Sequence, residues 1–94
     1  MTPELTTELL PPASRNSRAP RWAVRFEGKL IGEVQAKKIG RSSSQFYEGL
    51  VLIQGRLISI ELDTDLEERC EEILKAWRDP SSNVHTRYAL KLKE

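Results

Sequence analysis

Few side chains in this sequence belong to types that do covalent or metal chemistry. There is one cysteine, Cys70, and one histidine, His85, so an internal disulfide and a Cys/His metal set both lack the residues they need. A nucleophile also needs a base within reach, and no pattern directs His85 toward Cys70. Cys70 falls on the apolar stripe of a predicted helix, where we expect a small buried thiol. Such sparse cysteine use is typical of a reducing compartment.

Carboxylates and glycines add little to this chemistry. Glu33, Glu48 and Glu61 lie on successive predicted strands, but the expected register puts Glu33 on the opposite face from a cluster with the other two. The five glycines do not have the spacing of a phosphate-cradling loop. We therefore expect no enzyme activity, no metal and no cofactor.

Charge is distributed unevenly along the chain, and this points to binding. Residues 15–56 carry nine basic and three acidic groups, whereas residues 57–80 carry eight acidic and three basic groups. A basic surface attracts phosphates, and aromatic rings near it can stack on unpaired bases. The candidate nucleic-acid contacts are the phosphate-binding Arg21, Arg25, Lys37, Lys38 and Arg41, with Trp22 and Tyr47 as stacking residues.

The elements that position these residues begin with four predicted strands. Period-two alternation of apolar residues indicates antiparallel strands near 22–27, 30–38, 45–53 and 57–62. A three-residue loop, 27–29, makes the apolar faces of the first two strands coincide, whereas a two-residue loop would not. Gln54-Gly55 predicts a tight hairpin, which pairs Val51 with Ile58 and places Leu62 on the core face.

A helix near 65–78 follows the strands. Thr64 and Glu67 have the spacing of a capping box, and Asp79-Pro80 ends the helix. Its apolar stripe consists of Leu66, Cys70, Ile73, Leu74 and Trp77. Alternation over 84–92 then predicts a fifth strand, with a second helix as the alternative.

The first 20 residues differ in composition from the rest. They hold four of the five prolines and few large apolar residues, which predicts a disordered tail in which Leu5, Leu9 and Leu10 offer the only apolar face. The fold class predicted is therefore α+β, with a single domain over residues 21–94. The longest apolar run, 50–53, is too short to cross a bilayer, and we expect a cytoplasmic protein.

Two functions remain open. One predicted helix cannot cover both faces of the sheet, so Leu50, Leu52 and Leu57 on the opposite face form a candidate surface for a protein partner or a homodimer. The alternative is nucleic-acid binding through the basic hairpin and tail. The order of a four-strand meander and a helix resembles whirly-type single-strand DNA-binding domains and arm-type DNA-binding modules, and this resemblance implies DNA as a ligand. No small-molecule substrate is expected.

Overall fold

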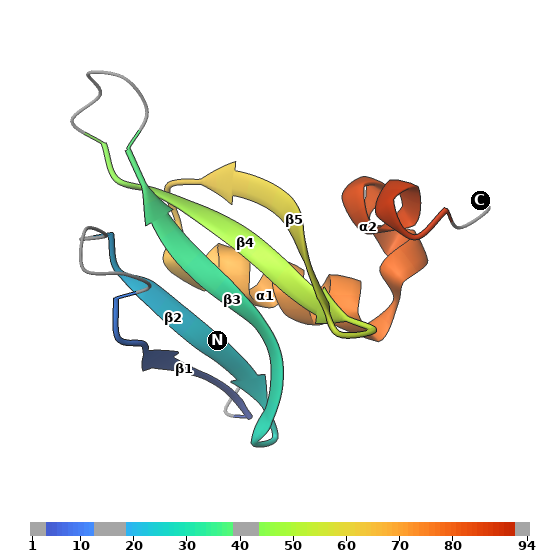
Figure 1. Ribbon diagram of the computed structural model, residues 1–94, viewed down its shortest axis with the longest axis horizontal. Helices are drawn as coiled ribbons and strands as arrows, with labels where there is room; N and C mark the ends of the chain where they lie inside the picture. The colour runs from blue at the N-terminus through green and yellow to red at the C-terminus, as the bar shows by residue number, and fades with distance from the viewer. Residues whose placement is uncertain (1–3, 13–18, 39–43, 92–94) are drawn as a thin grey trace.

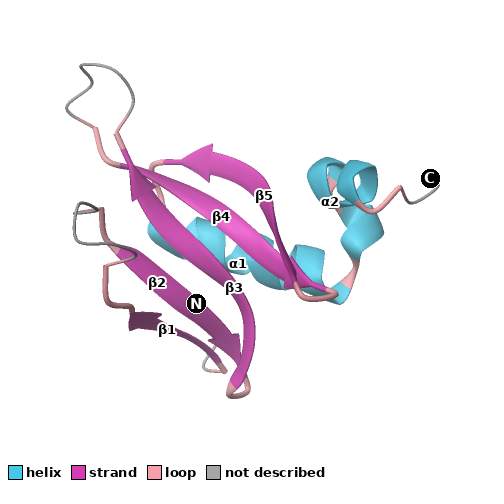
Figure 2. Cartoon of the chain, viewed as in Figure 1, coloured by secondary structure: helices cyan, strands magenta, loops and turns pink. Residues whose placement is uncertain are grey.

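The computed structural model describes residues 4–12, 19–38 and 44–91, and within them five strands form one antiparallel sheet (Figures 1 and 2). The strands are neighbours in chain order: β1 (Leu5–Leu9), β2 (Arg21–Phe26), β3 (Lys29–Lys37), β4 (Phe46–Ile53) and β5 (Arg56–Asp63). Two α-helices follow, α1 (Leu66–Arg78) and α2 (Val84–Ala89), joined through the 3₁₀ turn Pro80–Ser82. The predicted α+β class with an antiparallel sheet is confirmed.

The two helices lie differently on the sheet. In Figure 1, α1 runs behind the sheet, while α2 lies to one side, where it contacts β5. The side of the sheet facing the viewer carries neither helix. We call these two sides the helix-covered face and the helix-free face.

The core fills the space between α1 and the sheet. Its buried residues come from β1 to β5 and from α1: Leu5, Val24, Ile31, Val34, Val51, Ile58, Ile60, Cys70, Ile73, Leu74 and Ala76. The predicted helical stripe is confirmed, since Cys70, Ile73 and Leu74 are buried while Leu66 and Trp77 pack against the core at its margin.

The hairpin between β2 and β3 differs from the predicted three-residue loop. Phe26 pairs with Lys29 across a two-residue turn, Glu27-Gly28, in which both residues have positive φ. A β-bulge then restores the predicted register, so that Val24 pairs with Gly32 and Trp22 with Val34. The extra residue, Ile31, is fully buried. The bulge thus keeps the apolar faces of both strands together although the loop is short.

The β4–β5 hairpin has the predicted Gln54-Gly55 turn, with φ of 54° and 75°, and Val51 pairs with Ile58 as expected. A second bulge separates the Leu50–Ser59 pair from the Gly49–Glu61 pair, leaving Ile60 as the extra residue. Beyond this bulge, the residues of β5 lie on the faces opposite to those that unbroken alternation predicts. Leu62 therefore leaves the predicted core face, and Glu61 and Asp63 turn toward α1.

The prediction of a disordered tail over residues 1–20 is wrong for β1. Leu5–Leu9 pairs with β2 along its length, from Leu5 opposite Phe26 to Leu9 opposite Trp22. Leu5 is only 1 % exposed and belongs to the core, so backbone pairing with β2 and burial of this side chain together hold the strand in place. The sheet thus has five consecutive strands before the helix.

The N-cap of α1 lies one residue later than predicted. Asp65, not Thr64, is the N-cap, and its carboxylate accepts a hydrogen bond from the Glu68 backbone N–H at 3.1 Å. Thr64 instead donates its backbone N–H to the Asp63 carboxylate at 2.7 Å. The helix ends at Arg78, with Asp79 as its C-cap before Pro80, as expected.

The predicted last strand over 84–92 is wrong, and the alternative, a second helix, is what forms through Ala89. The Asn83 side chain caps it by accepting hydrogen bonds from the backbone N–H groups of His85 and Thr86. Thr86 is buried and donates its hydroxyl to the Pro80 and Asn83 carbonyl groups. Residue 92 lies outside the described residues. An alternating pattern this short fits a strand or a two-turn helix, and the cap decides between them.

Among the described helices, none has the length and apolar character that a bilayer-spanning segment requires.

Candidate partner-binding face of the sheet

The helix-free face has a hollow of about 180 Å³. Alternate residues of β2, β4 and β5 point away from α1, and this places Ala23, Leu52 and Leu57 on the same side of the sheet. Leu30 joins them because it precedes the bulge in β3 and pairs with Arg25. Leu10, just past β1, completes the apolar lining.

The leucines around this hollow are only partly covered. Leu30 is 40 % exposed and Leu57 is 48 % exposed, while Leu50 and Leu52 are half-buried. Leu52 and Leu57 therefore lie on the face opposite α1, as the sequence predicts, and both line this hollow. Leu50 pairs with Glu33 and Ser59 on the same face but does not line the hollow.

A buried carboxylate is among the groups that line the hollow. Glu33 is buried, and its two oxygens accept hydrogen bonds from Arg21 Nη1 at 3.2 Å and from Gln35 Nε2 at 2.5 Å. The Arg21–Glu33 contact is also an ion pair. Such pairing offsets the cost of burying the charge. The hollow thus combines apolar walls with a fixed hydrogen-bond acceptor.

The rim of the hollow carries a second ion pair. Arg25 Nε lies 3.5 Å from the Glu8 carboxylate of β1, and Arg25 Nη1 donates to the Gly28 carbonyl at 3.4 Å. Arg21 also donates through Nε to the Pro11 carbonyl at 3.0 Å. Arg21 and Arg25, two of the arginines predicted to hold phosphates, therefore have partners within the chain.

The predicted stacking residues face the core side of the sheet. The rings of Trp22 and Tyr47 lie 5.8 Å apart at 59°, and both pack against the buried cluster under the sheet. Tilted contacts of this kind stabilise a fold. Neither ring offers an open face beside Arg21 or Arg25 on the helix-free side.

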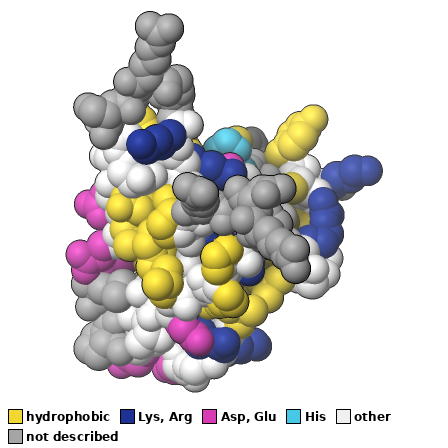
Figure 3. All heavy atoms as spheres, turned by 60° about the vertical axis from the view of Figure 1, so that its left-hand side comes forward, with side chains coloured by type: hydrophobic (Ala, Val, Ile, Leu, Met, Phe, Trp, Pro, Cys, Tyr) yellow, Lys and Arg dark blue, Asp and Glu magenta, His cyan; other side chains and the backbone are white. Residues whose placement is uncertain are grey.

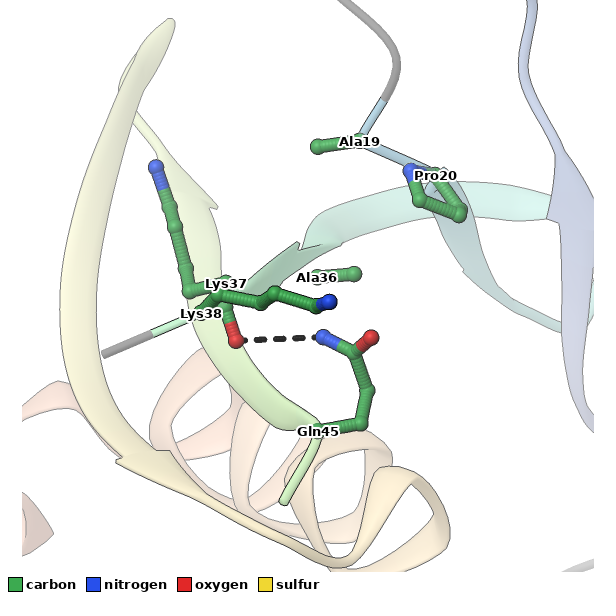
Figure 4. A pocket seen from close by; sticks show the side chains of 6 residues that line it. All are labelled: Ala19, Pro20, Ala36, Lys37, Lys38 and Gln45. Carbon is green, nitrogen blue, oxygen red and sulfur yellow. Dashed lines mark hydrogen bonds between the residues drawn. The ribbon is translucent and has the colours of Figure 1, made fainter. Parts of the chain in front are cut away.

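The remaining predicted phosphate contacts lie at the end of β3. Lys37 and Lys38 are exposed and line a second hollow, of about 300 Å³, with Ala19, Pro20, Ala36 and Gln45 (Figure 4). Figure 4 shows one lysine side chain running across this hollow and the other pointing away from it. Gln45 Nε2 donates to the Lys37 carbonyl at 3.1 Å. Arg41 lies outside the described residues.

Charges of both signs lie on the surface. Figure 3 shows acidic side chains along the left border of that view and beside basic side chains near its bottom, with further basic side chains near the top and at the right. In α1, Glu67 and Glu68 occupy the first turn and Lys75 and Arg78 the last turn, an order that the helix dipole favours.

The groups considered for catalysis lie apart from one another. Cys70 faces the core, where burial, followed by the charges of Glu67 and Glu71, raises the pKa of its thiol to about 11. His85 is exposed on α2. Glu33 and Glu48 lie on the helix-free face and Glu61 on the helix-covered face. The predicted register had instead put Glu33 on the face opposite to the other two. The described ranges contain no group of three His, Cys, Asp or Glu side chains placed to hold a metal ion.

Sequence reasoning missed the buried Arg69. Its guanidinium contacts Glu61 Oε2 at 3.3 Å, Glu68 Oε1 at 3.5 Å and Asp63 Oδ2 at 3.9 Å, and its side chain is 2 % exposed. Nε makes no hydrogen bond with the described residues. The bulge at Ile60 is what turns Glu61 and Asp63 toward this arginine. The sequence offered one signal for this burial: Arg69 directly precedes Cys70, which lies on the predicted apolar stripe.

No family model, curated protein or solved structure matches this chain.

Proposed function

We propose that this chain is a small non-catalytic binding protein that holds a protein partner on the helix-free face of its sheet. The observation that carries the proposal is the leucine-lined hollow on that face. Both helices pack elsewhere, so Leu30, Leu52 and Leu57 keep part of their apolar surface in water. Contiguous exposed apolar surface on a small protein usually marks an interaction site.

The polar groups around the hollow support a protein as the ligand. Arg25 with Glu8 and Arg21 with Glu33 place both signs of charge beside the leucines, which is the polar rim that protein interfaces have. A phosphate backbone would instead need cations without acidic neighbours. The ion pairs therefore favour a protein partner over a nucleic acid.

The proposal is tested with two variants of matched chemistry. Leu57→Asp puts a charge at the edge of the hollow. Leu9→Asp puts the same charge on another exposed leucine, in β1, and serves as the control. Leu9 lies on the helix-covered side of the sheet, because its strand partner Trp22 packs against the core there. Wild type and both variants are immobilised and used to capture proteins from native extract. Hydrogen exchange then maps the face that a captured protein protects.

We expect wild type and Leu9→Asp to retain the same partner and Leu57→Asp to lose it, with protection in β2, β4 and β5. Circular dichroism checks that all three proteins are folded. Equal capture by Leu57→Asp, or protection confined to α1, would show that the helix-free face is not the binding surface.

A further inference from the structure

β1 is an outer strand of the sheet, and its backbone is open on one side. It pairs with β2 alone among the described strands, and Figure 1 shows it at the border of the sheet away from α2, which contacts β5. Its pairing with β2 has no register shift, whereas β5, at the other border, is interrupted by a bulge. From Thr6 to Leu9 every residue is exposed. A regular, exposed strand edge is able to pair with a further strand.

The hydrogen bonds at the two ends of β1 show which of its backbone groups face outward. The Glu4 carbonyl accepts a hydrogen bond from the Glu27 N–H at 3.0 Å, and the Leu10 N–H donates to the Arg21 carbonyl at 2.9 Å. In an antiparallel pair, residues bonded to the neighbouring strand alternate with residues whose N–H and C=O point away from it. Between Glu4 and Leu10, the residues whose groups point away from β2 are therefore the odd-numbered ones: Leu5, Thr7 and Leu9.

These outward groups match those of a second, antiparallel copy of the same strand. With Thr7 opposite Thr7, Leu5 lies opposite Leu9 of the second copy, so every outward residue meets an outward residue. A shift of one residue would instead put outward residues opposite inward ones. A shift of two leaves one outward residue beyond the end of β1 and, in one direction, brings the two Glu8 side chains opposite each other, where like charges repel.

The same register covers exposed apolar surface. Leu9 is 66 % exposed, and its side chain lies on the helix-covered side of the sheet, as does that of the buried Leu5. Residues opposite each other share a face, so Leu9 would lie beside Leu5 of the second copy, at the border of the core, and lose contact with water. The two Thr7 side chains would meet on this face as well, and paired threonines stabilise neighbouring strands.

We propose that two copies of this chain join through their β1 strands, with Thr7 opposite Thr7, and form one continuous sheet. The interface is two-fold symmetric, so it uses both β1 edges and leaves neither open. It uses the edge of the sheet rather than the helix-free face, and the inference therefore does not rest on the proposed function. One short strand from each copy buries little surface, so we expect the dimer to dissociate on dilution.

Two substitutions at Thr7 test the backbone pairing. Thr7→Pro removes the outward N–H at the centre of the interface and leaves the hydrogen bonds to β2 in place, because this N–H does not face β2. Thr7→Ala keeps the N–H and is the matched control. Sedimentation velocity over a concentration series is run on wild type, on both variants and on Leu57→Asp. Circular dichroism checks that each protein is folded.

We expect wild type, Thr7→Ala and Leu57→Asp to dimerise, and Thr7→Pro to associate at least about tenfold more weakly. A wild-type protein that is monomeric at every concentration overturns the inference. So does a dimer that Thr7→Pro leaves intact. A dimer that Leu57→Asp abolishes also overturns it, because the contact would then lie on the helix-free face.

Cysteine substitutions at two neighbouring exposed threonines test the register without relying on proline. The two Cα atoms at position 7 would be about 5.5 Å apart, within the range that a disulfide spans. Those at position 6 would be diagonal neighbours about 7 to 8 Å apart, which is too far. Cys70 is buried, so the introduced thiol is the accessible one.

Under mild oxidation, at a concentration where wild type dimerises, Thr7→Cys should form a covalent dimer at least about tenfold faster than Thr6→Cys. Non-reducing electrophoresis measures both rates. Equal rates, or faster cross-linking through position 6, would exclude the pairing centred on Thr7 even in a protein that is a dimer.

Discussion

Among the described glycines, Gly32 in β3 leaves the least room for a side chain. A Cβ atom built there would lie 2.3 Å from the Leu50 carbonyl oxygen and 2.7 Å from Ile73 Cγ2. Gly32 faces α1, so the absence of a side chain lets the helix lie close to the sheet. Gly49, on the neighbouring strand, faces the same helix with ordinary spacing, since its nearest contact would be Ile60 Cγ1 at 3.4 Å.

These two glycines provide a matched pair of substitutions. Gly32→Ala should lower the free energy of unfolding by about 2 kcal/mol or more, because the backbone oxygen of Leu50 cannot move aside easily. Gly49→Ala should change it by less than about 1 kcal/mol. Urea denaturation of both variants measures the difference. Equal effects of the two substitutions would contradict the close packing at Gly32.

The sequence predicts some residues of the candidate site and not others. Alternation along the strands is enough to place Leu52 and Leu57 together on the face away from α1. It cannot show that Arg21 pairs with Glu33 or Arg25 with Glu8, because these pairs join different strands and depend on the register. Residue type alone therefore suggested phosphate binding for arginines that have partners within the fold.

At the scale of elements, β1 shows how little sequence signal a strand needs at the edge of a sheet. Its five residues bury one side chain, Leu5, and the other four are exposed. The β2–β3 hairpin supplies the template, since Leu5 pairs with Phe26 and Thr7 with Val24. Composition therefore indicated disorder, although pairing with β2 orders this segment.

This account of β1 predicts unequal effects at its two leucines. Leu5→Ala should destabilise the protein by about 2 to 4 kcal/mol, because it leaves a cavity in the core. Leu9→Ala should cost less than about 0.5 kcal/mol, because that side chain is largely exposed. Thermal or urea unfolding measures both. If Leu5→Ala is as stable as wild type, β1 is not part of the folded sheet.

The other elements separate what local pattern encodes from what tertiary structure decides. The strands from β2 to β5 and helix α1 follow their hydrophobic periods within one or two residues. The two bulges do not, because an extra residue such as Ile31 or Ile60 is stabilised by burial that only the assembled core provides. For α2, the hydrogen bonds of the Asn83 cap favour a helix, although the residues alternate as in a strand.

At the scale of the whole molecule, two groups of described cations differ in their surroundings. Arg21, Arg25 and Arg69 contact carboxylates of the same chain. Lys37 and Lys38 are exposed at the end of β3, with no ion pair shown to another described residue. Binding of nucleic acid would therefore depend on this lysine pair far more than on the arginines of the helix-free face.

Binding to a labelled single-stranded oligonucleotide at two salt concentrations checks this division of roles. We expect weak binding at low salt that falls steeply as salt is added and is lost in Lys37→Glu/Lys38→Glu. Arg25→Gln should have little effect, because that guanidinium pairs with Glu8. Tight binding that Arg25→Gln abolishes would instead revive nucleic acid as the ligand of the sheet face.

The bulge at Ile60 affects how copies of this chain can accumulate. β5 is an outer strand, and its register shifts partway along its length. A shifted strand cannot offer a regular ladder to an incoming strand, so fibril growth by continuous backbone pairing is disfavoured along this border.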